Sequence, residues 1–181
     1  MKPRHLVLVF AACVLAMPVL AHSPMTPYAG QQARTIKALS DEDIAALLKG
    51  DGMGFAKAAE LNGYPGPKHV LDLAEKLKLT DAQREQVRAI FDRMSGAAKP
   101  IGAELVEHER LLDQLFHNGE ITPDRLGAET TAIGELQGRL RSVHLAAHLE
   151  TRGLLNPDQI PLYQQLRGYD GAGAPMHHHH G

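Results

Sequence analysis

The sequence predicts an all-α protein, a long bent antiparallel helical hairpin with short flanking helices. Aromatic residues make up only 4% of the 181 residues and Trp is absent, whereas sheet proteins are usually rich in aromatic and β-branched side chains. Apolar residues also recur in steps of three and four through most of the second half, which is the spacing of one helix face. The charged fraction of 22% is that of an ordinary globular chain.

The first 21 residues have the pattern of a secretory signal peptide. Lys2 and Arg4 precede an apolar run, and Val19 and Ala21 supply the small residues that come before a cleavage site. We therefore expect the chain to be exported and cleaved after Ala21. Two alternatives stay open at this point. The run can serve as a membrane anchor, although it is shorter than the roughly 20 residues that a spanning helix needs, or Cys13 can be lipidated.

Three further segments follow the signal peptide. Residues 22–39 are polar and small, and we interpret them as a flexible arm. A helical domain is expected over 40–169, and residues 170–181 are expected to form a disordered tail that holds His177–His180. These histidines are either a native metal-binding tail or part of an expression tag. Cys13 is the only cysteine, so a cleaved chain has neither a disulfide nor a thiolate metal site.

Short helices are predicted ahead of the hairpin. Ser40 is a good N-cap for a helix over 41–49, whose acidic first turn suits the positive end of the helix dipole. One or two helical turns are expected over 55–61. A turn rich in Pro and Gly occupies 63–67, and the apolar spacing over 69–77 indicates a further short helix. All of these short helices are expected to pack near the open end of the hairpin.

The hairpin itself is expected to pair residues 81–116 with 123–152. Thr80 and Gln83 form a capping box that starts the first helix, and Pro100 inside this helix predicts a bend because it removes one backbone hydrogen bond. The second helix carries a heptad-like apolar seam. One hairpin has too little second layer to cover its apolar stripe, so we expect a homodimer.

A helix start signal occurs twice in the chain. Each copy has a leucine, a capping residue and a glutamine three residues after the cap. The copies are Leu79-Thr80-Asp81-Ala82-Gln83 and Leu155-Asn156-Pro157-Asp158-Gln159. Each is a hydrophobic residue followed by a capping box. The second copy follows Gly153, where we expect the hairpin to end, and it starts another short helix.

With these two copies flanking a hairpin in an exported chain without disulfides, residues 66–168 resemble the LTxxQ family of periplasmic proteins. This family includes Spy/CpxP-like chaperones and CnrX/ZraP-like heavy-metal resistance or sensor proteins. The resemblance implies a periplasmic all-α hairpin that dimerises into a curved cradle. It also implies either an ATP-independent chaperone or a metal binder. Asn156 replaces the motif threonine and preserves capping.

His144 and His148 are the main candidate metal ligands. They are four residues apart, so both imidazoles project from one helix face and can clamp one Zn, Ni, Co or Cu ion. Antiparallel pairing of the hairpin places His144 opposite Ser95 and His148 opposite Phe91. The pair also fits a purely structural interpretation, as two polar residues that flank the apolar seam.

Three weaker candidates are His69, Met94 and Asp92. The hairpin register brings Asp92 and Met94 within reach of the histidine pair, and His69 can approach from the open end. Nickel sensors of the resembled family use a histidine pair before the first motif, a Glu on the long helix and a His/Met pair on the later helix. This chain keeps one histidine in the first region, His69, and has Asp92 near the Glu position. His108 and His117 are expected on the surface.

We expect a periplasmic heavy-metal-resistance accessory protein that binds or senses a divalent metal. The alternative is a Spy/CpxP-like chaperone of unfolded client proteins or an envelope-stress regulator, and a third reading is a structural dimer that touches the periplasmic domain of a membrane sensor. The net charge of −2 argues against nucleic acid as a partner. It also gives no basic surplus for a client-binding cradle. No Gly-x-Ser-x-Gly or phosphate loop points to an enzyme.

Overall fold

The computed structural model describes residues 27–169 of the chain. The chain divides into two compact units, Met1–Gly30 and Gln31–Gly181, and only a short turn of the first is described. The predicted signal peptide and the predicted tail lie outside the described residues. The fold and the site below belong to the second unit.

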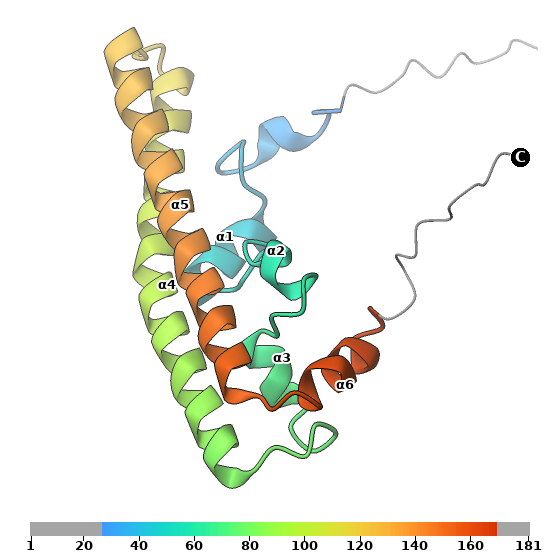
Figure 1. The fold of residues 1–181 in the computed structure, drawn as a ribbon. Coiled ribbons are helices and arrows are strands. Elements are labelled where there is room, and N and C mark those ends of the chain that lie inside the picture. The colour runs from blue at the N-terminus through green and yellow to red at the C-terminus, as the bar shows by residue number, and fades with distance from the viewer. Residues whose placement is uncertain (1–26, 170–181) are drawn as a thin grey trace, which may run out of the picture. The chain divides into compact units, whose positions relative to one another are not determined.

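The described part of the chain is helical, which confirms the all-α prediction (Figure 1). Its only pairing of the β type within residues 27–169 is an isolated bridge between Ile36 and Leu39. The elements in chain order are η1 (Gln31–Ala33), α1 (Asp41–Lys49), α2 (Lys57–Glu60), α3 (Pro67–Asp72), α4 (Asp81–His117), α5 (Pro123–Leu154) and α6 (Gln159–Leu166).

The long helices α4 and α5 pack antiparallel, as predicted (Figure 1). α4 begins at the expected capping box, in which the Thr80 hydroxyl accepts a hydrogen bond from the Gln83 N–H and the Gln83 side chain accepts one from the Thr80 N–H. The helix continues through Pro100 without a break. The bend at this proline stays a prediction.

α5 extends beyond Gly153, where the sequence analysis expected it to end. A glycine stops a helix when it adopts the left-handed conformation, and Gly153 is not among the residues with positive φ. The helix ends instead at Leu154, and the extended backbone of Leu155 leads away from it.

α3 is shorter than the predicted helix over 69–77 and begins two residues earlier. Pro67 takes the first helical position, where a missing N–H costs nothing. Turns follow Asp72 up to Lys78, whose φ of 52° lies in the left-handed region. The apolar spacing that predicted a helix instead marks core positions, because Val70, Ala74 and Leu77 are all buried.

Two clusters of apolar side chains make up the core of the unit. One lies at the open end of the hairpin and joins α3 and α6 to the start of α4. Its buried members are Val70, Ala74, Leu77, Leu79, Val87, Leu155 and Tyr163. The other lies midway along the hairpin and is formed by Leu47, Ala98, Ile101, Leu105, Leu136 and Leu140. α1 therefore packs against the middle of the hairpin, whereas the prediction placed all short helices near its open end.

The glutamines of the two repeated motifs bind each other. Gln83 Nε2 donates to Gln159 Oε1 over 2.9 Å, and Gln159 Nε2 donates to Gln83 Oε1 over 3.2 Å. Gln159 also closes the second capping box with Asn156. Since Gln83 Nε2 also donates to the Leu154 carbonyl, the two motifs hold the ends of α4 and α5 together.

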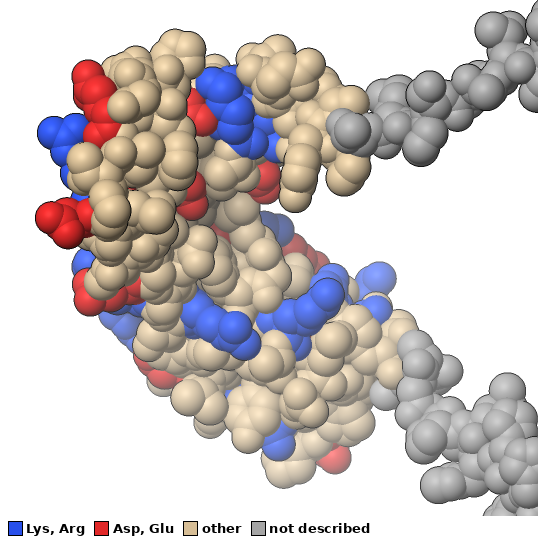
Figure 2. Space-filling model, turned by 90° about the horizontal axis from the view of Figure 1, so that it is seen from above, with Lys and Arg blue, Asp and Glu red and all other residues tan. Residues whose placement is uncertain are grey.

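The second half of the predicted arm packs rather than extending freely. Ile36 is buried, and the Lys37 backbone N–H donates to Asp113 of α4 over 3.1 Å. Seen from above, the surface carries charges of both signs separated by wide uncharged areas (Figure 2). None of the helices within residues 27–169 has the length and apolar character of a membrane span.

Candidate metal site

A pocket of about 390 Å³ lies beside the hairpin, where the loop after α1 meets α2, α3, α4 and α5. It brings together most of the residues selected from the sequence. His144 and His148 of α5, Met94 of α4 and His69 of α3 all line it. Asp92 is exposed and is not part of the lining, because residues two apart on a helix do not share a face.

His144 is buried in the pocket with one ring nitrogen unused. The residue is 2% exposed, and its ring stacks on Phe55 with centroids 6.2 Å apart. Its Nε2 atom is buried and has no hydrogen-bond partner. Burial, and after it the neighbouring His148, lower the pKa of His144, while Asp51 opposes the shift. The lowered pKa favours the neutral imidazole of His144, whose buried Nε2 atom has no hydrogen-bond partner.

His148 is oriented by a backbone contact. Its Nδ1 lies 2.7 Å from the Tyr64 carbonyl oxygen, and a carbonyl only accepts, so Nδ1 carries the proton and the neutral ring keeps its lone pair on Nε2. Metal-binding histidines are commonly fixed by such a bond. The His148 ring lies so close to the backbone of residue 66 that only a glycine fits there, because a Cβ would lie 2.9 Å from His148 Nε2. Arg152 holds this loop to α5 by stacking 4.5 Å over the Tyr64 ring.

Glu60 is the charged centre of the pocket, and the sequence analysis did not select it. It is buried on α2. Its Oε1 accepts hydrogen bonds from Tyr163 (2.5 Å) and Tyr169 (3.0 Å) and lies 3.3 Å from Arg167 Nε. Its Oε2 accepts from the Gly66 N–H over 3.2 Å. The carboxylate thus ties α2 to α6 and the residues after it.

Two histidines also approach Glu60, on opposite oxygens. His69 Nδ1 lies 3.5 Å from Oε1, and His148 Nδ1 lies 3.8 Å from Oε2. Because the His148 proton points at Tyr64 and both carboxylate oxygens already accept hydrogen bonds in the network around Glu60, these three side chains do not form a ligand set. Within residues 27–169 no group of three His, Cys, Asp or Glu side chains is placed to hold a metal ion.

The network predicts a specific acid sensitivity. Burial alone would raise the pKa of Glu60, but hydrogen bonds from His69, Tyr163 and Tyr169 outweigh it and lower the pKa to about 2 from a usual 4.5. A lowered pKa stabilises the fold fully above pH 4.5, and this contribution, roughly 3 kcal/mol, is lost as the pH falls through 2.

We therefore expect the free energy of unfolding to fall between pH 5 and pH 2 in the parent, and to fall much less in Glu60→Gln. Urea unfolding followed by circular dichroism across this range measures both. Glu107→Gln is the control, because Glu107 is paired with Arg110 on an exposed helix face and should keep the parental profile. Equal acid sensitivity of the parent and Glu60→Gln would contradict the role of this carboxylate.

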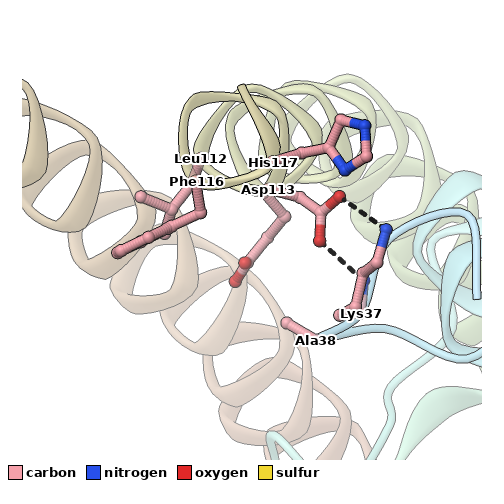
Figure 3. Close-up of a pocket in the computed structure, with 7 residues that line it drawn as sticks. Lys37, Ala38, Leu112, Asp113, Phe116 and His117 are labelled. Carbon is pink, nitrogen blue, oxygen red and sulfur yellow. Dashed lines mark hydrogen bonds and ion pairs between the residues drawn. The ribbon is translucent and has the colours of Figure 1, made fainter. Parts of the chain in front are cut away.

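A second groove, of about 520 Å³, lies beside α4 near the closed end of the hairpin. Figure 3 shows Asp113 turned toward Lys37, which donates to it through both Nζ and the backbone N–H. His117 and Phe116 line the same groove. Asp113 is already paired, so Glu109 and the exposed His117 are the remaining donors that line this groove, and it offers a metal fewer free donors than the pocket at His144. Elsewhere, His108 is half-buried and contacts Glu129 of α5 over 2.7 Å.

The geometry defines a class of protein, an antiparallel helical hairpin with glutamine-paired ends and a pocket of imidazole and thioether groups on one side. Comparison with known families agrees with this class. A family model described as heavy-metal resistance matches residues 58–161, which is more than half of the chain. The chain belongs to this heavy-metal resistance family, of the LTxxQ type. No curated protein and no solved structure matched the chain.

Two members of the pocket carried no usable sequence signal. Glu60 stands on a helix of four residues, too short for periodicity to distinguish a buried face from an exposed one. Its partners Tyr163 and Tyr169 lie about a hundred residues away. Met53 lies on a glycine-rich loop and also lines the pocket. Only the packing of this loop against α4 and α5 reveals it.

Proposed function

We propose that the chain is a non-enzymatic metal-binding protein of the bacterial periplasm, which binds or senses a divalent transition metal in the pocket through His144 and His148. The single observation that carries the proposal is the buried Nε2 of His144, which has no hydrogen-bond partner. A buried polar atom left unpaired costs about 1–3 kcal/mol. A metal ion at this nitrogen would remove that cost.

The residues around His144 fit such an ion. His148 presents a lone pair on Nε2, since its Nδ1 proton is used on Tyr64, and it lies one helical turn from His144. Met94 adds a thioether to the same pocket. The ligand chemistry suits Zn, Ni, Co or Cu. The tight network on Glu60 holds the walls of the pocket in place. Membership of a heavy-metal resistance family supports the same reading.

Export and assembly are parts of the proposal that rest on the sequence. The apparent signal peptide supports a periplasmic location with His22 as the first residue. Exposed apolar side chains near the closed end of the hairpin, Leu111, Phe116 and Leu126, suit a homodimer, a membrane sensor's periplasmic domain or an unfolded client. The same exposed residues favour the second candidate function, an ATP-independent chaperone.

Metal titration of the mature chain tests the proposed function. The four C-terminal histidines must first be removed as competitors, by the changes His177→Ser, His178→Ser, His179→Ser and His180→Ser. We expect this tail-substituted chain, isolated from the periplasm with an intact mass that starts at His22, to bind one equivalent of metal. We also expect the ion to raise its melting temperature, because the site exists only in the folded hairpin.

His144→Ala and His148→Ala should each remove most of this binding and of the thermal shift. His117→Ala is the matched control, because this histidine lies in the other groove, and it should bind as the parent does. Parental binding in both pocket variants would contradict the metal proposal. Suppression of client aggregation that survives both substitutions would favour the chaperone.

A further inference from the structure

Two methionines share the pocket with the histidines. Met94 comes from α4, and Met53 comes from the loop that connects α1 to α2. Met53 has a φ of 41°, in the left-handed region that favours glycine or asparagine. Glycines stand on both sides of it, so a third glycine would follow the same backbone without strain. A methionine in this place lines the pocket, with 41% of its surface exposed, at a conformational cost.

The pocket is poor in free oxygen ligands. Glu60 is saturated by tyrosines, Arg167 and a backbone N–H. Asp51 lines the pocket from the same loop as Met53, and both side chains are exposed to solvent, so Asp51 is the one free carboxylate among the described residues of the lining. Zn²⁺ is almost always bound by four ligands in structural sites and by three protein ligands in catalytic ones. The described residues offer no such group of three His, Cys, Asp or Glu side chains.

The charge around the pocket also disfavours a doubly charged ion. Three lysines, Lys49, Lys57 and Lys68, line the pocket against two acidic residues, Asp51 and Glu60, and the Glu60 carboxylate is already paired with Arg167. Repulsion grows in proportion to the charge of the ion. A monovalent ion that needs only a few soft ligands is repelled less by these basic side chains than a divalent ion.

We propose that Cu(I) is the preferred ion of this pocket, held by the imidazole of His144 and the thioethers of Met53 and Met94, with His148 beside them. Thioether ligands select Cu(I) over the harder divalent ions. The inference rests on the proposed function, because it concerns the same pocket and the same histidines, and it replaces the divalent ion proposed there with a monovalent one. It accounts for the methionine at a left-handed position, which a zinc or nickel site does not require.

Competition with a chromogenic Cu(I) chelator, under anaerobic reducing conditions, measures the affinity of the tail-substituted mature chain for Cu(I). Zn²⁺ and Ni²⁺ are titrated in parallel. The test variant is Met53→Leu with Met94→Leu, because leucine has nearly the same volume and no sulfur. We expect Cu(I) affinity to fall more than about tenfold, since even outer-shell changes commonly cost that much. Affinity for Zn²⁺ and Ni²⁺ should not change.

A second variant protects the test against misfolding. Met53→Gly removes the thioether and suits the left-handed backbone, so it should melt no lower than the parent while it loses Cu(I) affinity. X-ray absorption at the copper edge should show sulfur scattering in the parent and none in the double leucine variant. Parental Cu(I) affinity in both variants, or a copper spectrum without sulfur, would overturn the Cu(I) inference and leave the proposed function intact. A parent that binds none of the three ions would overturn both.

Discussion

Leu140→Asp is expected to lower the free energy of unfolding by about 3–5 kcal/mol, which is a large share of the stability of a domain of this size. Leu140 is 1% exposed and lies in the cluster midway along the hairpin, among side chains of α1, α4 and α5. An aspartate there would bury a carboxylate without a partner and leave a void where the leucine packed. Thermal and urea unfolding followed by circular dichroism measure the loss.

The matched control for Leu140→Asp stands on the same helix. Leu149 is 61% exposed, so Leu149→Asp makes the same chemical change in contact with water and should alter stability by less than about 0.5 kcal/mol. Equal melting temperatures for Leu140→Asp and the parent would contradict the packing of α5 on α4. An equal loss of stability in Leu140→Asp and Leu149→Asp would contradict it as well.

Gly102→Ala is the second change with a large expected effect. The backbone of α1 crosses α4 at this glycine, and an added Cβ would overlap the Leu47 carbonyl oxygen and lie 2.8 Å from its carbonyl carbon. Backbone atoms at the end of a packed helix cannot move aside as a flexible side chain can. We expect a loss of about 1–3 kcal/mol, as for other overpacked cores, with faster amide hydrogen exchange throughout α1 as that helix lifts from the hairpin.

Gly96→Ala is the control for this prediction, because it should change the free energy of unfolding in the opposite direction. Gly96 lies in the same helix, and a Cβ there would meet nothing within 4 Å. Alanine is favoured over glycine inside a helix by about 0.5–1 kcal/mol, so this variant should be more stable than the parent. Equal melting temperatures for Gly102→Ala and Gly96→Ala would show that α1 does not sit against the α4 backbone.

The hairpin could be predicted because its signals are local. The capping box at Thr80 and Gln83 and the apolar spacing on either side of the turn locate both long helices to within a few residues. Local signals fail where a residue serves distant partners. The pairing of Gln83 with Gln159 joins residues 76 positions apart, and a capping pattern alone does not reveal it.

The part of the candidate site that lies on the two long helices could be predicted in the same way as the hairpin. Antiparallel pairing of two helices fixes which residues face each other, so His144, His148 and Met94 were correctly brought together in one pocket. The prediction that Asp92 lies within reach of the histidine pair was wrong, because this residue is on a different side of α4 from Met94. Glu60 and Met53 were missed because a short helix and a loop carry no periodicity, and only the folded chain places them against α5 and α6.

An anomalous-difference map is the most direct test of the metal site. Crystals of the tail-substituted mature chain, grown with Cu(I) in one set and Zn²⁺ in another, would be measured at the absorption edge of each metal. For the bound ion we predict one peak in the pocket, about 2.0–2.1 Å from the Nε2 atom of His144. A single peak away from both His144 and His148, or a metal-bound protein whose pocket holds no peak, would contradict the site.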